Sequence, residues 1–265
     1  MEDPKGAAVR SETDRFVIDW AGDTWTLEHA DGRMGLKSAD STWLHLAMAG
    51  LAATGRRDDS AFHRSALVGL EVVHSRLVAT FEPAGWHGLT VRAAWSRSRE
   101  GAGIDLEVQA SASSVGELRR LEILVETAPE GGWSGDQPLI VEPRDRLAAG
   151  STYDGREPAA MLARLFTSAV HPLDSQRFRP GRLVRSDRGP FVTMGHPQDV
   201  ARWGHVEGAG GIAIRYALFG FDLEKGVVLR GRLREVRFAE GSGSVERRNE
   251  EYGLFVTEPP PLRTE

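Results

Sequence analysis

The chain has 265 residues, a formal net charge of −5 at pH 7 and no cysteine. The absence of cysteine excludes disulfides, thiolate zinc sites and cysteine nucleophiles, and the interspersed acidic and basic residues disfavour a binder of nucleic-acid backbones. The first residues, MEDPKGAAVRSETDR, lack the apolar stretch of a secretory signal, and no segment has the ~20 apolar residues of a membrane helix. We therefore expect a cytoplasmic protein with no nucleic-acid or membrane partner.

Alternation of apolar and polar residues, which is typical of half-buried strands, begins near the N-terminus. Residues 15–20 and 23–29 each place apolar side chains on one face, and Asp31-Gly32 is a hairpin signal that supplies a positive φ. The segment Ser41–Ala53 has no clear period, so its pattern fits either a strand or a helix. Residues 1–13 are expected to form a loose tail.

The middle of the chain has the clearest strand pattern. Residues 76–82, 88–96, 103–110 and 120–126 alternate strictly, and each run ends at a glycine, a proline or a charge-rich turn. In the last of these runs Leu121, Ile123 and Val125 oppose Glu122 and Glu126. This pattern predicts an antiparallel meander with one solvated face and one buried face.

Residues 127–190 carry a Gly-Gly pair, several prolines and little alternation, which predicts long loops. One helix is expected over Pro158–Phe166, because proline suits the first helical position. Further strands are expected at 189–194, 211–219, 226–238 and Tyr252–Thr257, before a loose, proline-containing tail at 258–265. The elements together predict an all-β fold, a large antiparallel two-sheet sandwich with very little helix. We expect one domain over residues 1–265.

Three histidines lie in the loop-rich part of the chain and are candidate catalytic residues: His171, His196 and His205. Histidine beside a carboxylate is suited to acid–base catalysis near neutral pH, and His205 and Glu207 share a face if their segment is extended. The alternative is that these histidines cap backbone groups in loops. No HxH or HExxH spacing supports a metal chelate, and no nucleotide-binding or serine-hydrolase motif is present, so no cofactor is expected.

Arginine forms a second candidate group, in which Arg230, Arg232 and Arg234 lie on one face of the strand expected over 226–238. Their forked donors suit carboxylates, phosphates or vicinal hydroxyls. The alternative is a solvated strand whose arginines pair with glutamates on a neighbouring strand. Val236 and Phe238 share the parity of the arginines, which indicates a bulge or twist near Arg234.

Tryptophan supplies the third group, because sugar rings stack on exposed indoles. Most of the seven tryptophans fall in strand patterns, where core packing is the default. Trp133 and Trp203 lie in glycine-containing segments without a periodic neighbour, so we expect these two to contact a ligand.

The strand rhythm resembles the supersandwich of galactose mutarotase-like proteins. The resemblance is carried by Leu67–Val72, Ser75–Glu82, Gly88–Ser96, Gly103–Ala110 and Glu117–Glu126, and by the run IAIRYALFGFDLEKGVVLRGRLREVRF at 212–238. It implies binding of a carbohydrate on a concave sheet, with interconversion of anomers or cleavage by a histidine acid and a glutamate base. His171, His196 or His205 could be that acid, and Glu207 or Glu224 the base, although the flanking residues differ from epimerase signatures.

Two hypotheses follow. The first is a carbohydrate-active enzyme of mutarotase, epimerase or glycoside-processing type, and the second is a non-catalytic sugar-binding or assembly protein that keeps the fold. Both expect a carbohydrate or uronate ligand. A histidine and a carboxylate that converge in a pocket would favour the enzyme, and a site made only of arginine and aromatic side chains would favour binding.

Overall fold

The computed structural model describes residues 9–12, 15–20, 23–30, 32–38, 44–73, 76–86, 88–98, 103–113, 118–127, 137–138, 181–186, 189–208, 211–238 and 244–258. Within these residues nearly all regular structure is antiparallel strand, arranged as two sheets that we call sheet A and sheet B. The helix expected over 158–166 lies outside the described residues.

Sheet A contains, in spatial order, β1 (Val9–Glu12), β2 (Arg15–Trp20), β3 (Asp23–Ala30), β4 (Arg33–Ser38), β5 (His45–Ala53), β11 (Leu118–Thr127), β16 (Gly211–Leu223) and β15 (Val200–Gly208), with β6 (Arg56–Asp58) also paired to β5. Sheet B contains β12 (Gln137–Pro138), β13 (Gly181–Ser186), β14 (Gly189–Gly195), β17 (Val228–Arg237), β10 (Gly103–Ala112), β9 (Leu89–Arg97), β8 (Arg76–Phe81) and β7 (Leu67–Val73). A short 3₁₀ turn, η1 (Arg64–Ala66), precedes β7, and one helix, α2 (Val245–Thr257), follows β17.

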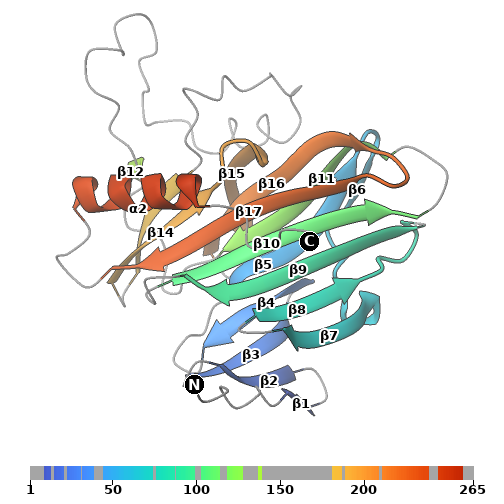
Figure 1. The fold of residues 1–265 in the computed structure, drawn as a ribbon, viewed down its shortest axis with the longest axis horizontal. Helices are drawn as coiled ribbons and strands as arrows, with labels where there is room; N and C mark the ends of the chain where they lie inside the picture. The colour runs from blue at the N-terminus through green and yellow to red at the C-terminus, as the bar shows by residue number, and fades with distance from the viewer. Residues whose placement is uncertain are drawn as a thin grey trace, which may run out of the picture.

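The two sheets pack face to face around one apolar core, as Figure 1 shows. The predicted alternation accounts for this, since Ile123 of β11, Leu106 of β10 and Trp95 of β9 all point into the same core cluster. We call the face of each sheet that is turned away from this core its outer face. The predicted two-sheet antiparallel sandwich is confirmed by the strand order.

The ambiguous segment Ser41–Ala53 contributes strand β5, which is buried on both faces. Leu46 and Met48 belong to the main core, whereas Ala49 packs with Leu124 and Ala217 on the outer face of sheet A. Because both faces are covered, the strand is apolar apart from His45 and shows no period of two. This double burial is the reason that the sequence pattern left the segment open.

Two predictions about the ends of the chain are corrected. Val9–Glu12, expected in a loose tail, pairs with β2 as an edge strand. Tyr252–Thr257, expected as a strand, is the second half of helix α2. Ser244 caps this helix by accepting a hydrogen bond from the backbone N–H of Arg247.

The expected bulge near Arg234 is also wrong, because β17 pairs with β10 without any shift of register. Val236 and Phe238 remain on the arginine face and are buried there by Tyr252 and Phe255 of α2. Figure 1 shows α2 lying along β14 at one end of the sandwich. The apolar residues that looked misplaced in the strand pattern are therefore the docking surface of the helix.

No helix in the described part of the chain combines the length and the apolarity needed to cross a membrane.

Gly50 of β5 tests the packing of the outer face of sheet A. A Cβ at this position would lie 2.7 Å from the carbonyl oxygen of Asp58 and 3.0 Å from the Cα of Asp59, both backbone atoms. We expect Gly50→Ala to lower the free energy of unfolding by roughly 1–3 kcal/mol, the usual cost of overpacking. The measurement is urea denaturation followed by tryptophan fluorescence.

Gly253→Ala is the matched control, because a Cβ there meets no atom of the described residues within 4 Å and the residue lies inside α2. Alanine in a helix interior should raise the free energy of unfolding by about 0.5–1 kcal/mol. Equal effects of the two substitutions would contradict the described approach of the Asp58–Asp59 turn to β5.

Candidate functional site

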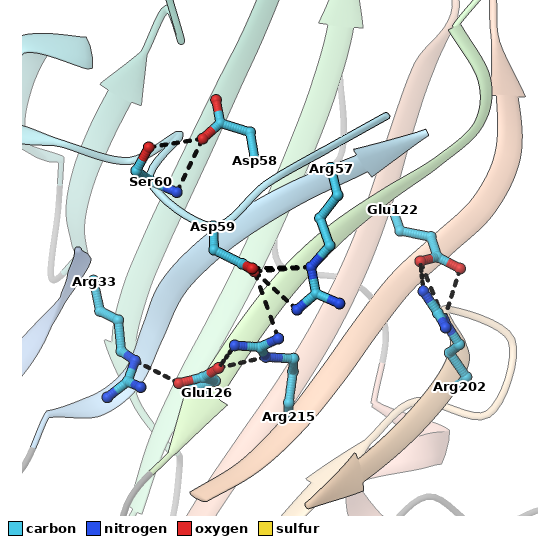
Figure 2. Close-up of polar contacts among 9 residues, drawn as sticks. All are labelled: Arg33, Arg57, Asp58, Asp59, Ser60, Glu122, Glu126, Arg202 and Arg215. Carbon is cyan, nitrogen blue, oxygen red and sulfur yellow. Dashed lines mark hydrogen bonds and ion pairs between the residues drawn. The ribbon is translucent and has the colours of Figure 1, made fainter. Parts of the chain in front are cut away.

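A network of charged side chains covers the outer face of sheet A, drawn in Figure 2. At its centre Glu126 of β11 contacts Arg33 of β4, with 2.5 Å between Nε and Oε2, and also receives the guanidinium of Arg215. Glu126 and Arg215 stand directly opposite each other on β11 and β16. We call Arg33, Arg57, Asp59, Glu126 and Arg215 the Glu126 cluster.

The open end of this cluster is formed by the turn that follows β6. Asp59 accepts two hydrogen bonds at Oδ1 from Arg57, at 2.9 and 3.1 Å, and its Oδ1 also lies 3.5 Å from Nη1 of Arg215. Glu126 is only 1% exposed, whereas Asp59 is 55% exposed and Arg57 41%. The cluster therefore runs from a buried carboxylate to a solvent-facing ion pair.

Asp58 holds the turn in place. Its Oδ1 accepts hydrogen bonds from the backbone N–H and the hydroxyl of Ser60, and its Oδ2 lies 3.3 Å from the indole nitrogen of Trp86. Burial acts to raise the pKa of Asp58, but the hydrogen bonds from Ser60 and Trp86 outweigh burial and hold the pKa below its ordinary value. An ionised Asp58 therefore fixes the turn that carries Asp59.

A second ion pair lies on the outer face of sheet A, next to the Glu126 cluster. Arg202 of β15 donates to both oxygens of Glu122 on β11, with 3.0 Å between Nε and Oε1 and 2.5 Å between Nη2 and Oε2. The two strands are separated by β16, whose backbone has positive φ at Phe219 and Gly220. A Cβ on Gly220 would lie 2.8 Å from Cβ of Ala201, so glycine permits the close approach of β15 at this irregularity.

The chemistry of this face follows from its residues. Each of these arginines on sheet A is oriented by a carboxylate. A guanidinium held in this way presents its N–H groups in a fixed direction, suited to hydroxyl or carboxylate oxygens. The Glu126 cluster has three guanidiniums for two carboxylates, so it is net positive. Side chains of this kind bind polyhydroxylated or anionic ligands.

A second polar group lies on the outer face of sheet B, beneath α2. Arg234 of β17 donates to both oxygens of Asp105 on β10, at 2.5 and 2.8 Å, and to Glu258 after α2 at 2.6 Å. Arg232 donates to the backbone carbonyl of Glu258 at 2.8 Å. The ring of Phe255 lies 5.0 Å from the guanidinium carbon of Arg234 and 5.7 Å from that of Arg232.

The turn after β14 brings His196 and Asp199 to the same place. Asp199 accepts a hydrogen bond from the backbone N–H of Arg232 at 3.0 Å, and its Oδ2 lies 3.7 Å from Nδ1 of His196. Burial raises the pKa of Asp199 to about 6, since the charge and N–H of Arg232 offset it only in part and the carboxylate of Glu107 adds to it. Burial, aided by Arg232, lowers the pKa of His196.

A third polar group joins the two sheets inside the sandwich. Glu235 of β17 contacts Nδ1 of His45 at 2.7 Å and accepts a hydrogen bond from the hydroxyl of Thr127 at 2.7 Å. Leu46 has a φ of 42°, which interrupts the alternation of β5 so that His45 and Leu46 both turn inward. Burial acts to raise the pKa of Glu235, but His45, Thr127 and Arg237 together outweigh it, and the pKa lies below its ordinary value. Both side chains are about 6% exposed, so this pair is a structural link between the sheets.

The structure brings together some of the predicted site residues. His196 lies beside Arg232, and Arg232 and Arg234 share the α2 end of the sheet, whereas Arg230 is half-buried further along β17. His205 and Glu207 occupy strand β15 rather than a loop, opposite Ile214 and Ile212.

Two of the predicted residues, His171 and Trp133, lie outside the described residues. A site shared by the three histidines therefore stays a prediction. Trp203, which was expected in a loop, lies on β15 and packs against the main core while half-buried.

Sequence reasoning missed the Glu126 cluster. It assigned Glu122 and Glu126 correctly to the face of β11 opposite the core, but interpreted that face as solvated. Both side chains are nearly fully buried. The signal was absent because Arg33, Asp59 and Arg215 are distant in sequence and meet only when β4, β6 and β16 assemble.

Within the described residues, no group of three or more histidine, aspartate or glutamate side chains is placed to hold a metal ion.

Removing the charge of Glu126 tests the cluster energetically. We expect Glu126→Gln to lower the free energy of unfolding by roughly 3–5 kcal/mol, because the buried guanidinium of Arg215 then no longer faces the buried negative charge of Glu126. Adding Arg215→Met should restore part of the loss. Glu250→Gln, in an exposed pair with Arg247, is the control and should cost less than about 1 kcal/mol. A cost for Glu126→Gln as small as the control's, by chemical denaturation, would contradict the cluster.

The raised pKa of Asp199 predicts a pH dependence of stability. Between pH 3.8 and about 6 the folded state holds a proton that the unfolded state releases, so the free energy of unfolding falls as pH rises through this window. The slope reaches at most about 1.4 kcal/mol per pH unit. In Asp199→Asn the amide does not ionise, so the variant should gain stability relative to the parent from pH 4 to pH 6.5 and then level off.

The comparison between variant and parent cancels the contribution of His196, whose lowered pKa acts in the opposite direction in both proteins. Denaturation midpoints measured at half-unit pH steps provide the test. A difference between the two proteins that stays constant with pH would show that Asp199 titrates normally.

No protein-family model and no curated protein matches the chain. Among solved structures it is similar to a galactose mutarotase related enzyme from Lactobacillus acidophilus, with 9% identity, a TM-score of 0.43 and coverage of 89% of this chain and 99% of that one. It is also similar to an α-N-acetylgalactosaminidase from Bifidobacterium bifidum in complex with GalNAc, with 12% identity, a TM-score of 0.45 and coverage of 96% of this chain and 38% of the other.

A GH36 α-galactosidase from Geobacillus stearothermophilus is similar over 88% of this chain and 41% of its own length, with 12% identity and a TM-score of 0.42. The chain thus spans about two fifths of the length of the two glycosidases. The mutarotase-related enzyme is of the kind that the strand rhythm resembles. The order of the strands defines the fold of this chain as a two-sheet antiparallel sandwich.

Proposed function

We propose that the protein binds a carbohydrate on the outer face of sheet A, at the open end of the Glu126 cluster. The observation that carries this proposal is the graded burial of the cluster. Glu126 and Arg215 are buried and fixed, while Arg57 and Asp59 present a donor fork and a carboxylate to solvent. The strand pattern that resembles galactose mutarotase-like proteins points to the same ligand class.

A sugar presents hydroxyl groups that both donate and accept hydrogen bonds. Each hydroxyl donates one hydrogen bond and accepts others, so adjacent hydroxyls need acceptors and donors side by side. Asp59 supplies acceptor oxygens and Arg57 supplies donors within 3.1 Å of each other. Because Asp58, Ser60 and Arg215 hold this turn, binding costs little ordering of the protein.

An acid–base enzyme acting on sugars is the second candidate. It is favoured by Asp199, whose pKa of about 6 suits a general acid near neutral pH, and by His196, whose ring nitrogen lies 3.7 Å away. This pair lies in the turn between β14 and β15, against Arg232 of β17, and is separate from the Glu126 cluster. Exchange between the α and β anomers of an aldose, followed by NMR with and without the protein, would separate the two functions.

The binding proposal predicts the behaviour of Arg57→Ala and Asp59→Asn. Both side chains are exposed, so each substitution should leave the melting temperature nearly unchanged. Each should reduce the affinity for the bound sugar about tenfold or more, which corresponds to one lost hydrogen bond to a charged group. Isothermal titration calorimetry with galactose, glucose, N-acetylgalactosamine and galacturonate provides the measurement.

Arg92→Ala is the matched control, because Arg92 forms an exposed pair with Glu71 at 3.2 Å on the outer face of sheet B. This substitution should not alter sugar binding. The proposal is wrong if no sugar in the panel binds the parent protein, or if Arg92→Ala weakens binding as much as the two variants at the turn.

A further inference from the structure

The arginine pair beneath α2 has an unusual set of partners. Arg234 is 3% exposed and binds two carboxylates, of which Asp105 comes from the neighbouring strand. Asp105 faces Arg234 directly in the register of β10 and β17, so this contact is built into the sheet. The second carboxylate belongs to Glu258, the C-cap residue that follows α2, and its position depends on how the helix docks.

Glu258 meets the arginines as a bound ligand would. Its carboxylate lies 3.4 Å from Nη1 and 2.6 Å from Nη2 of Arg234. Its backbone carbonyl oxygen accepts a hydrogen bond from Arg232 at 2.8 Å, and the ring of Phe255 lies against both guanidiniums. A carboxylate with a second oxygen acceptor close by is therefore the chemical group that these two arginines recognise.

A separate observation indicates a missing donor at the same place. Glu107 of β10 stands opposite Arg232 and is 4% exposed. Gln109 donates to its Oε1, but its Oε2 is buried and has no hydrogen-bond partner among the residues that the structure describes. Buried carboxylate oxygens are rarely left unpaired, and a hydroxyl group from a ligand would supply the donor.

Helix α2, which covers Arg232 and Arg234, packs against neighbouring strands of sheet B. Its apolar residues pack in a small cluster with β14 and β17 that is separate from the main core. Its other face is exposed, and Gly253 in its interior disfavours the helical state relative to alanine. Elements with few buried apolar contacts open at lower free energy than the core of a domain.

We propose that Arg232 and Arg234 form a binding site for a hydroxylated carboxylate of the sugar-acid class, and that Glu258 occupies this site in the absence of ligand. A uronate carries the carboxylate for Arg234, a neighbouring oxygen for Arg232 and hydroxyls for Glu107. Its binding displaces Glu258 and loosens α2. The site is independent of the carbohydrate site on sheet A, which lies on the opposite side of the sandwich.

The test uses the full chain with galacturonate as the probe and galactose as its neutral match. Glu258→Ala removes the competing carboxylate, so it should strengthen galacturonate binding at least about fivefold, at the lower end of the usual range of coupling between sites. It should not change galactose binding. Adding Arg232→Ala to Glu258→Ala should abolish the gain.

Two further measurements make the outcome decisive. Glu250→Ala removes the same charge from the exposed face of α2, where Glu250 contacts Arg247, and should leave galacturonate binding unchanged. Hydrogen exchange of the α2 amides in the parent should become faster on addition of galacturonate and not on addition of galactose. The proposal is overturned if Glu258→Ala binds galacturonate no better than the parent, or if Glu250→Ala produces the same gain. Arg57→Ala, which tests the sheet A site, should not affect this gain, so the two proposals can fail separately.

Discussion

The burial of strand β11 on both faces is the constraint on which the rest of the site depends. Ile123 and Val125 point into the core between the sheets, and the alternation of the strand then forces Glu122 and Glu126 outward. Because that outer face is also covered, the two carboxylates are taken out of water and must be paired. The arginines from β4, β15 and β16 supply the pairing, and they extend across the sheet from this one strand.

On each sheet a different element shields the charged side chains of the outer face from water. On sheet A the cover is the tight turn at Asp58–Ser60, which Gly50 allows to approach β5 closely. On sheet B the cover is α2, which reaches the arginines of β17 from a separate element. A turn braced by several hydrogen bonds keeps its carboxylate in place, whereas a helix end can exchange its carboxylate for one from solution. This difference is the basis for proposing a preformed binding site on the outer face of sheet A and a site occupied by Glu258 on the outer face of sheet B.

Arg232 and Arg234 of β17 show what the alternation of a strand can predict and what it cannot. Alternation placed Arg232 and Arg234 on the face opposite the core, and the structure confirms that placement. Their partners depend on which strand lies alongside and on what covers the face. Asp105 comes from a strand more than a hundred residues earlier, and Glu258 from a helix that the sequence pattern presented as a strand. Tyr252, Phe255 and Val256 have helical spacing, but a run of six residues is too short to separate the two periods.

The sequence by itself determined the all-β class, most strand positions and the inward face of each strand, because these follow from local alternation at a period of two. Only the tertiary structure decided which charged residues meet. Glu126 and Arg215 come from the neighbouring strands β11 and β16, and Arg33 comes from β4, which β5 separates from β11 in sheet A. The three residues are far apart in the chain. His45 and Glu235 meet across the two sheets in the same way. Alternation specifies which face a side chain occupies and carries no information about the neighbouring strand, so long-range pairing and the covering of a face arise only when the sheets assemble.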